Sequence, residues 1–370
     1  MELQAAPTSA AQGRFWPLLR LSFGAHSLLL GLTLAYLAAF LLIDASTPLA
    51  GARDGLEVML SIMLVSAPAV FFALLIYKFI EMAVYENPDR PLKTLWRNFR
   101  AVLADRERMA AGLPVFIVLV IFMYVFTMVK SHVPVLAPYA WDVTFDQWDR
   151  VLHFGYRPWE LLQPVFGFWP VTFLVNLNYN MWFVVMNVFW AYYAFIAKPG
   201  EERTRFFISY MMIWIVGGGV LAVVFSSAGP CYYTRIGLSP DPYVPLMDYL
   251  RSANEVLPIW ALSAQDMLWQ LQSEGSAFGG ISAMPSMHNA TALLFVLTSG
   301  DRPLWVRRGL IVHAALIFLG SVHLGWHYAV DGYLAFALAY AVWRAMEPVA
   351  RWWEQSSAAQ NYKTAIRVGG

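Results

Sequence analysis

Two short stretches near the C-terminal end of the chain hold residue types that can act together on phosphorus. One contains Pro285, Ser286 and His288, and the other contains His327 and Asp331. His327 and Asp331 are four residues apart, so on a helix the carboxylate can accept a hydrogen bond from the imidazole. Such a bond fixes the tautomer, leaves the far ring nitrogen as a nucleophile, and stabilises the cation that forms when that nitrogen bonds to phosphorus.

The second histidine supplies the proton chemistry that such a reaction needs. His288 can protonate the departing oxygen and later deprotonate the incoming one. Pro285 and Ser286 precede it at a predicted helix start, where a hydroxyl and free backbone N–H groups suit phosphate oxygens. We therefore predict that His327 attacks, Asp331 orients it, and His288 moves protons, without a metal or another cofactor.

The elements that must position these groups are long apolar runs. The chain is 59% hydrophobic and only 13% charged, whereas a soluble domain usually carries about 25% charged residues. A membrane span needs about 20 apolar residues. We expect an all-α fold, a polytopic transmembrane helical bundle of about eight spans, at residues 21–43, 56–80, 112–130, 169–197, 206–228, 286–300, 304–325 and 328–346.

The cationic residues predict the orientation of these spans. His288 opens the sixth run and His327 lies between the seventh and eighth, so both fall on one side of the membrane. That side also receives the loops 131–168 and 229–284, and all but six of the 25 Lys and Arg residues fall on the other side. By the positive-inside rule both termini are cytoplasmic and the site is extracytoplasmic. The absence of a long tail favours a bacterial inner membrane.

Two other kinds of protein fit parts of this pattern. His323, His327 and Asp331 are spaced i, i+4 and i+8, which on one continuous helix suits zinc in an intramembrane hydrolase of the ceramidase type. A turn near Gly325 would break that stripe. A transporter or scaffold that retains the histidines as structural remnants is the non-enzymatic alternative.

The two stretches resemble the second and third motifs of the type 2 phosphatidic acid phosphatase superfamily. The first of these family patterns is Pro-Ser-Gly-His, which Pro285, Ser286 and His288 match with Met287 in the glycine position. The other is Ser-Arg-x5-His-x3-Asp, whose last two residues match at positions 327 and 331.

The resemblance implies roles and an architecture. His327 would be the phosphohistidine nucleophile, Asp331 its orienting partner and His288 the general acid and base. A six-helix catalytic core would cover residues 111–350. Before it, residues 1–110 would form a two-span extension with a cytoplasmic amphipathic segment, which lies on anionic headgroups or is a solvated basic loop. Residues 351–370 would form a cytoplasmic tail.

The chain also departs from the family pattern. Gly320 and Ser321 occupy the serine and arginine positions of the third motif, and the family's first motif, Lys-x6-Arg-Pro, is missing from the extracytoplasmic side. Arg235, which follows the fifth span, is our candidate phosphate ligand, although it could also anchor to lipid headgroups. The other predicted substrate-binding residues are Ser286, Tyr232, Tyr233 and Asn180.

A His-Tyr-x-x-Asp element without the arginine is similar to the inositol phosphorylceramide synthase branch, as is the segment 146–158 with Asp149, Gly155 and Pro158. Members of that branch move a phospho-headgroup from a phospholipid to a lipid alcohol. We therefore expect a lipid phosphotransferase or phosphatase, with ceramide or diacylglycerol as the acceptor in the first case. A simple lipid phosphate phosphatase is the alternative. A net charge of +1 argues against a nucleic-acid partner.

Overall fold

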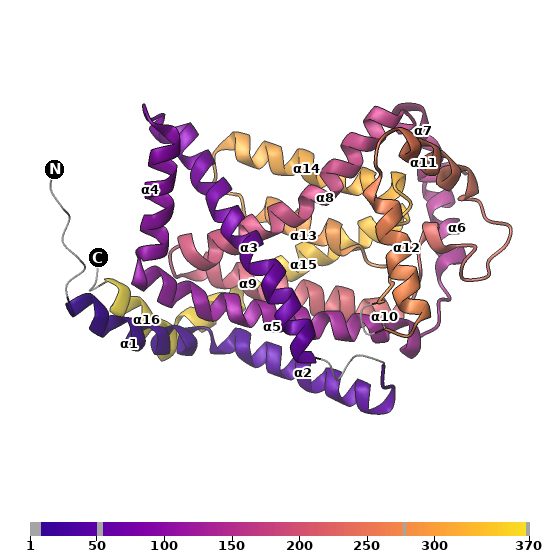
Figure 1. Cartoon of the computed structure of the whole chain (residues 1–370). Helices are drawn as coiled ribbons and strands as arrows, with labels where there is room; N and C mark the ends of the chain where they lie inside the picture. Colours follow the sequence, from indigo (N-terminus) through magenta and orange to yellow (C-terminus); the bar gives the residue numbers. More distant parts are fainter. Residues whose placement is uncertain (1–8, 50–54, 277–278, 368–370) are drawn as a thin grey trace.

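The computed structural model describes residues 9–49, 55–276 and 279–367, and within these ranges the chain forms helices without strands (Figure 1). The helices are α1 Ser9–Ala25, α2 Ser27–Ser46, α3 Gly55–Glu81, α4 Pro91–Ala104, α5 Arg106–Leu136, α6 Asp142–Leu152, α7 Pro158–Phe166, α8 Trp169–Ala191, α9 Glu201–Ile213, α10 Ala222–Val224, α11 Val244–Val256, α12 Trp260–Ser273, α13 Met287–Leu297, α14 Leu304–His323, α15 Ala329–Glu354 and α16 Ser357–Arg367. The π-helical segments η1 Met82–Glu86, η2 Tyr192–Ile196 and η3 Trp214–Leu221 continue α3, α8 and α9, and η4 Pro230–Tyr232 is a 3-10 turn. The predicted all-α fold is confirmed.

The long helices pack side by side as a bundle. In the described part of the chain, α15 contacts α9 and α13, α13 also contacts α14, and α14 contacts α8. The helix α5 runs along the bundle and contacts α2, η2 and η3 (Figure 1). This arrangement encloses the short helix α13, which begins within the Pro-Ser-Met-His stretch, between longer neighbours.

Four helical stretches of the described residues are long and apolar enough to cross a membrane. They are α2, α5, α14 and the continuous run Glu201–Val224. Each of the eight apolar runs predicted from the sequence overlaps helical residues, although the first includes the end of α1 and the break at His26. The helices α3, α8 and α15 are also long enough for a crossing, with 27, 23 and 26 residues. The total of about eight crossings stays a prediction.

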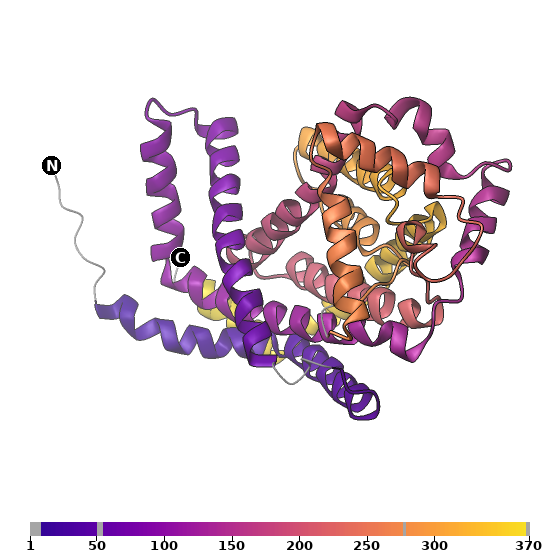
Figure 2. The same cartoon turned by 45° about the vertical axis from the view of Figure 1, so that its right-hand side comes forward.

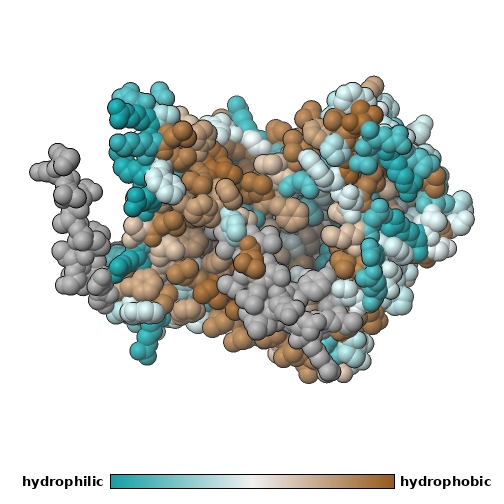
Figure 3. Space-filling model, viewed as in Figure 1, coloured by the Kyte–Doolittle hydropathy of each residue, from teal (hydrophilic) through white to brown (hydrophobic). Residues whose placement is uncertain are grey.

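The surface agrees with a membrane protein. Figure 3 shows hydrophobic residues over the middle of the bundle and hydrophilic residues gathered at its two ends. One hydrophilic group lies over α4, and the other lies at the end where Figure 1 places α6, α7 and α11. Large apolar side chains such as Leu42, Phe72 and Leu174 are more than half exposed along the helices between these ends. Lipid is the environment in which such exposure carries no penalty.

The two ends of the bundle hold different short elements. The helices α6, α7, α11 and α12 come from the two long loops and gather at one end (Figure 1). The helices α1 and α16 pack together at the other, where the Trp353 indole donates to the Ala25 carbonyl at 2.8 Å. The predicted amphipathic segment, residues 81–110, is divided among η1, α4 and the start of α5. The helix α4 stands beside α3 and apart from the bundle in Figure 2. Its Leu92 and Trp96 are exposed.

Candidate active site

The helix α13 begins at Met287, directly after the predicted helix start at Pro285 and Ser286. Ser286 is the N-cap residue, and its hydroxyl accepts a hydrogen bond from the Asn289 backbone at 3.5 Å. The Ser286 N–H in turn donates to the Asp331 carbonyl at 3.3 Å, which joins the start of α13 to the start of α15. His288 is therefore held in the first turn of α13, next to the element that carries Asp331.

The contact between His327 and Asp331 also forms, but outside a continuous helix. The α15 helix begins at Ala329, with Tyr328 as its N-cap, so His327 belongs to the preceding turn. Asp331 Oδ2 lies 3.1 Å from His327 Nδ1 and accepts a hydrogen bond from the Tyr328 N–H at 3.1 Å. The carboxylate therefore faces Nδ1, which leaves Nε2 as the nitrogen available for attack.

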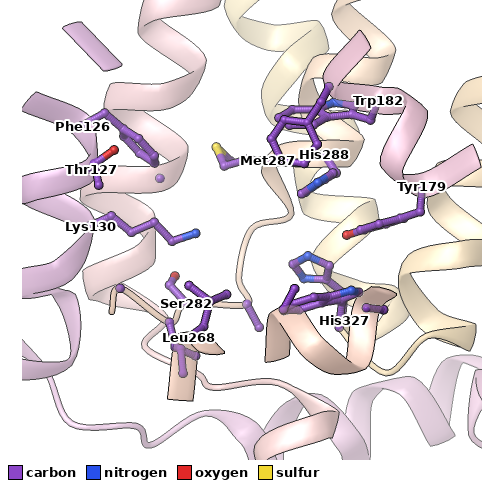
Figure 4. A pocket seen from close by; sticks show the side chains of 18 of the residues that line it. Phe126, Thr127, Lys130, Tyr179, Trp182, Leu268, Ser282, Met287, His288 and His327 are labelled. Atoms are coloured by element: carbon purple, nitrogen blue, oxygen red, sulfur yellow. The ribbon is translucent and has the colours of Figure 1, made fainter. Parts of the chain in front are cut away.

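Both histidines line one cavity of about 460 Å³. Its walls come from α5, α8, η3, α12, the segment 280–288 and the turn 326–327. Figure 4 shows the rings of His288 and His327 on one side of this cavity and the Lys130 side chain reaching in from the other. Residues that are far apart in the sequence thus share one chamber with two imidazoles and one ammonium group.

Aromatic side chains hold the His288 ring in place. It stacks on Tyr179 with ring centroids 4.6 Å apart, and the Trp182 ring lies at 4.1 Å. Phe183 meets it edge to face at 6.1 Å. All three rings come from α8 and line the cavity. The proton-transfer group therefore stands against an apolar wall.

Lys130 is the functional candidate that the sequence analysis did not single out. It lies on α5 near the end of an apolar helix, and within the described residues its ammonium makes no hydrogen bond or ion pair. A cation at such a position is costly unless it has a use. The sequence did contain a signal for Lys130. It is a cation at the end of an apolar run, and the predicted orientation places only six Lys and Arg residues on the extracytoplasmic side.

The surroundings keep His327 neutral. Burial lowers the pKa of His327 from 6.5 to about 3, the positive charge of Lys130 acts in the same direction, and contact with the Ala283 backbone opposes the shift. A neutral imidazole has the lone pair that an attack on phosphorus requires. The nucleophile is thus in its reactive form at neutral pH.

Only two of the five predicted substrate-binding residues line the cavity. Tyr232 and Asn180 line the cavity. Arg235 pairs with Asp266 and lies over the Tyr232 and Trp269 rings, outside the cavity lining.

Two further predicted residues also lie outside the lining. Tyr233 packs against Tyr243, and Ser286 is occupied as the cap of α13. Lys130, not Arg235, is therefore the cation that faces the two histidines.

The position of the family's third-motif arginine has a different use here. Ser321 is fully buried on α14, its hydroxyl donates to the Phe318 carbonyl at 2.7 Å, and it accepts from the Asn289 amide at 3.3 Å. The Ser321 carbonyl accepts the backbone N–H groups of Trp326 and His327 at 3.0 and 3.1 Å. This position therefore supports the His327 turn and supplies no charge.

The histidine stripe required by the zinc alternative is broken. The helix α14 ends at His323, and Gly325 adopts a left-handed conformation with φ of 74°. His323 points instead toward Thr172, whose hydroxyl lies 3.0 Å from its Nε2. Within residues 9–49, 55–276 and 279–367, no group of three or more His, Cys, Asp or Glu side chains is placed to hold a metal ion.

Comparison with curated proteins and comparison with solved structures each gave no match. A family model described as the PAP2 superfamily matches residues 143–345, more than half of the 370-residue chain. The match runs from α6 into α15 and contains both histidines and Asp331. The family model describes the superfamily as a whole, so the likeness to inositol phosphorylceramide synthase stays a prediction. The chain belongs to the PAP2 superfamily, and this membership indicates a membrane enzyme of the lipid phosphatase and phosphotransferase class.

Proposed function

We propose that the chain is a membrane-embedded lipid phosphotransferase that works through a phosphohistidine at His327. The observation that carries this proposal is the shared cavity of His327, His288 and Lys130, with Asp331 behind the nucleophile. Each of the tasks in phosphoryl transfer then has a group in place: attack, orientation, proton transfer and charge neutralisation.

In the first step, Nε2 of His327 forms a bond to phosphorus while the bond from phosphorus to the lipid oxygen breaks. His288 donates a proton to that oxygen, which leaves as an alcohol. The imidazole of His327 becomes cationic, and Asp331, 3.1 Å from its Nδ1, stabilises this charge. In the second step, an incoming hydroxyl loses its proton to His288 and attacks phosphorus, and His327 is released.

Lys130 balances the phosphate charge during both steps. An ammonium that faces into a largely apolar cavity attracts an anion more strongly than one in water does. Among the described lining residues it is the one Lys, Arg, Asp or Glu side chain. We assign to Lys130 the phosphate-binding role that the sequence analysis gave to Arg235.

The apolar part of the cavity supports a lipid as the leaving group. Met123 and Met186 line it seven residues beyond Lys130 and Tyr179 on their helices, which at 1.5 Å per residue is about 10 Å deeper in the bundle. Phe126 and Trp214 line the same region. If the hydrocarbon chain of the donor lipid occupies this space, its ester oxygen lies beside His288. The lipid part of the donor is then the leaving alcohol.

The apolar lining also favours transfer over hydrolysis. Most of the lining side chains are aromatic or aliphatic, and a site that excludes water protects a reactive intermediate from hydrolysis. A lipid alcohol such as ceramide or diacylglycerol is then the acceptor. A simple lipid phosphate phosphatase is the second candidate, because both reactions share the same intermediate and differ only in the second nucleophile.

The test is lipid turnover by purified protein in detergent with excess EDTA. Phospholipid donors are supplied with and without ceramide or diacylglycerol, and products are followed by mass spectrometry. His327→Ala is compared with His313→Gln, a histidine outside the cavity lining. We expect EDTA-resistant, acceptor-dependent product that is lost only in His327→Ala.

The other outcomes each contradict one part of the proposal. Product without acceptor dependence supports the phosphatase. Inhibition by EDTA supports the zinc hydrolase, and inactivity toward every lipid offered supports a transporter or scaffold.

A further inference from the structure

The helix α6 carries three buried carboxylates on one face. Asp142, Asp146 and Asp149 are spaced i, i+4 and i+7, and they are 1%, 6% and 2% exposed. Buried carboxylates are costly unless hydrogen bonds or charges satisfy them. Each of the three does have such partners: Asp142 binds Ala228, which lines the catalytic cavity, and Asp149 binds the start of α15, which follows His327.

Asp149 caps the first turn of α15. Its two oxygens accept the backbone N–H groups of Ala329 at 2.8 Å and Val330 at 3.0 Å. These are the first two helical residues, whose N–H groups have no partner within the helix. A carboxylate at a helix N-terminus also interacts favourably with the helix dipole. The next residue along the chain is Asp331.

Asp142 holds the neighbouring loop from the other end of α6. Its carboxylate accepts the N–H groups of Ala228 at 3.0 Å and Gly229 at 2.8 Å, together with the Tyr328 hydroxyl at 2.9 Å. Tyr328 is the N-cap of α15 and follows His327 directly. The two ends of α6 therefore fix both the cavity loop around Ala228 and the start of α15.

The carboxyl group of Asp331 has few contacts that determine its position. Its Oδ2 contacts His327 and the Tyr328 N–H, whereas its Oδ1 is buried and has no hydrogen-bond partner in the described part of the chain. Because His327 lies before the helix and Asp331 within it, their separation depends on the backbone of the three residues between them. Asp149 binds two of those three residues.

We propose that Asp149 is a positioning residue: it holds the first turn of α15 so that Asp331 meets Nδ1 of His327. This inference rests on the proposed phosphohistidine function. Asp149 touches neither substrate nor phosphorus, and it acts through Asp331. Groups that orient metal-binding histidines from behind typically change activity about 10- to 100-fold when they are replaced, and we expect an effect of that size for Asp149.

The first test compares Asp149→Asn with Asp146→Asn. Asparagine keeps one acceptor oxygen and replaces the other with a donor, so one N–H of α15 loses its partner. Asp146 is a matched control, because it is buried on the same helix but binds Arg157 and Tyr243 instead of α15. We expect kcat of Asp149→Asn to fall about 10- to 100-fold with KM nearly unchanged, and kcat of Asp146→Asn to fall much less at a similar thermal stability.

A double-mutant cycle with Asp331→Asn separates positioning from a general loss of structure. If Asp149 acts through Asp331, then Asp149→Asn has little further effect on kcat once Asp331 is replaced. Independent effects that multiply in the double variant would overturn the proposal. So would equal losses in Asp149→Asn and Asp146→Asn.

Hydrogen exchange tests the same contact without any substrate. Peptides that cover residues 326–333 should exchange faster in Asp149→Asn than in the wild type, and those over α5 should not change; unchanged exchange at 326–333 would overturn the proposal. The inference and the proposed function fail in different ways. Full turnover by Asp149→Asn with loss in His327→Ala overturns the positioning role alone, whereas turnover that survives in His327→Ala overturns the proposed function.

Discussion

Nδ1 of His327 lies 3.1 Å from Oδ2 of Asp331, although only Asp331 belongs to α15. The spacing of four residues suggested a contact along one helix face. In the structure, the same contact arises between a turn and the first turn of a helix, because Gly325 ends the path of α14 with a positive φ. The pair is therefore held by the loop geometry around it as well as by its own spacing.

Asp331→Asn should strongly slow the chemical step. An amide cannot compensate the positive charge of a phosphorylated imidazole, and it can favour the wrong tautomer of His327. We expect kcat to fall about 10²- to 10⁴-fold, as for the corresponding change in a Ser-His-Asp triad, with little effect on KM. Steady-state kinetics with a saturating acceptor measure both constants, and a loss confined to KM would contradict this role.

Lys130 and Arg235 make opposite predictions for phosphate binding. Lys130 faces the histidines across the cavity, whereas Arg235 pairs with Asp266 outside it. Lys130→Met should lower kcat/KM about 100-fold, and Lys130→Arg should retain part of it. Arg235→Met is the matched control and should change kcat/KM about twofold or less, as for a surface ion pair. The reverse order of effects would return the role to Arg235.

His288 should matter most when the leaving group is poor. General acid catalysis is worth about 10²- to 10⁴-fold for a strongly basic leaving oxygen and little for a nitrophenol. His288→Gln should therefore be far more active, relative to wild type, on a nitrophenyl phosphodiester than on a phospholipid. His327→Gln should lose activity on both substrates. An equal loss on both substrates in His288→Gln would mean that His288 is not the acid.

The pH profile should lack the acid limb of an ordinary histidine. The groups that face His327 are Lys130, His288 and Asp331, and its pKa is lowered from 6.5 to about 3 by burial and by the Lys130 charge. A histidine of pKa 6.5 would be about thirtyfold less abundant in its neutral form at pH 5 than at pH 8. Because the folded pKa is depressed, the nucleophile stays neutral throughout this range.

This profile is measured as phosphoenzyme formation between pH 5 and 8, with a phosphodiester whose charge does not change over that range. Lys130→Met removes one of the causes and should move any acid limb upward in pH. A fall in the wild-type rate centred near pH 6.5 would contradict the lowered pKa of His327.

The local features of the site could be predicted from the sequence. The helix start after Ser286, the turn at Gly325 and the pairing of His327 with Asp331 depend on residues a few positions apart, where spacing determines the geometry. The helices follow from long apolar runs for the same reason. The two predicted histidines therefore line the same cavity, with Asp331 in contact with His327.

The long-range partners could not be predicted in the same way. Lys130 and Arg235 are both cations on the predicted site side, and only the packing of α5 decides that Lys130 faces the cavity. Arg235 meets Asp266, 31 residues later. Asp149 meets Ala329, 180 residues later. A single sequence contains no signal for such pairs, because the rotation of each helix about its axis is set by all its neighbours together.

The most direct test of the account is to trap the phosphoenzyme. Wild-type protein is mixed with a phospholipid in the absence of acceptor, quenched rapidly and digested, and the peptides that contain His288 and His327 are examined by mass spectrometry. We predict a phosphoryl or phospho-headgroup adduct on His327, absent in His327→Gln and more abundant without acceptor than with it. Turnover without any adduct on His327, or an adduct on His288 instead, would contradict the mechanism.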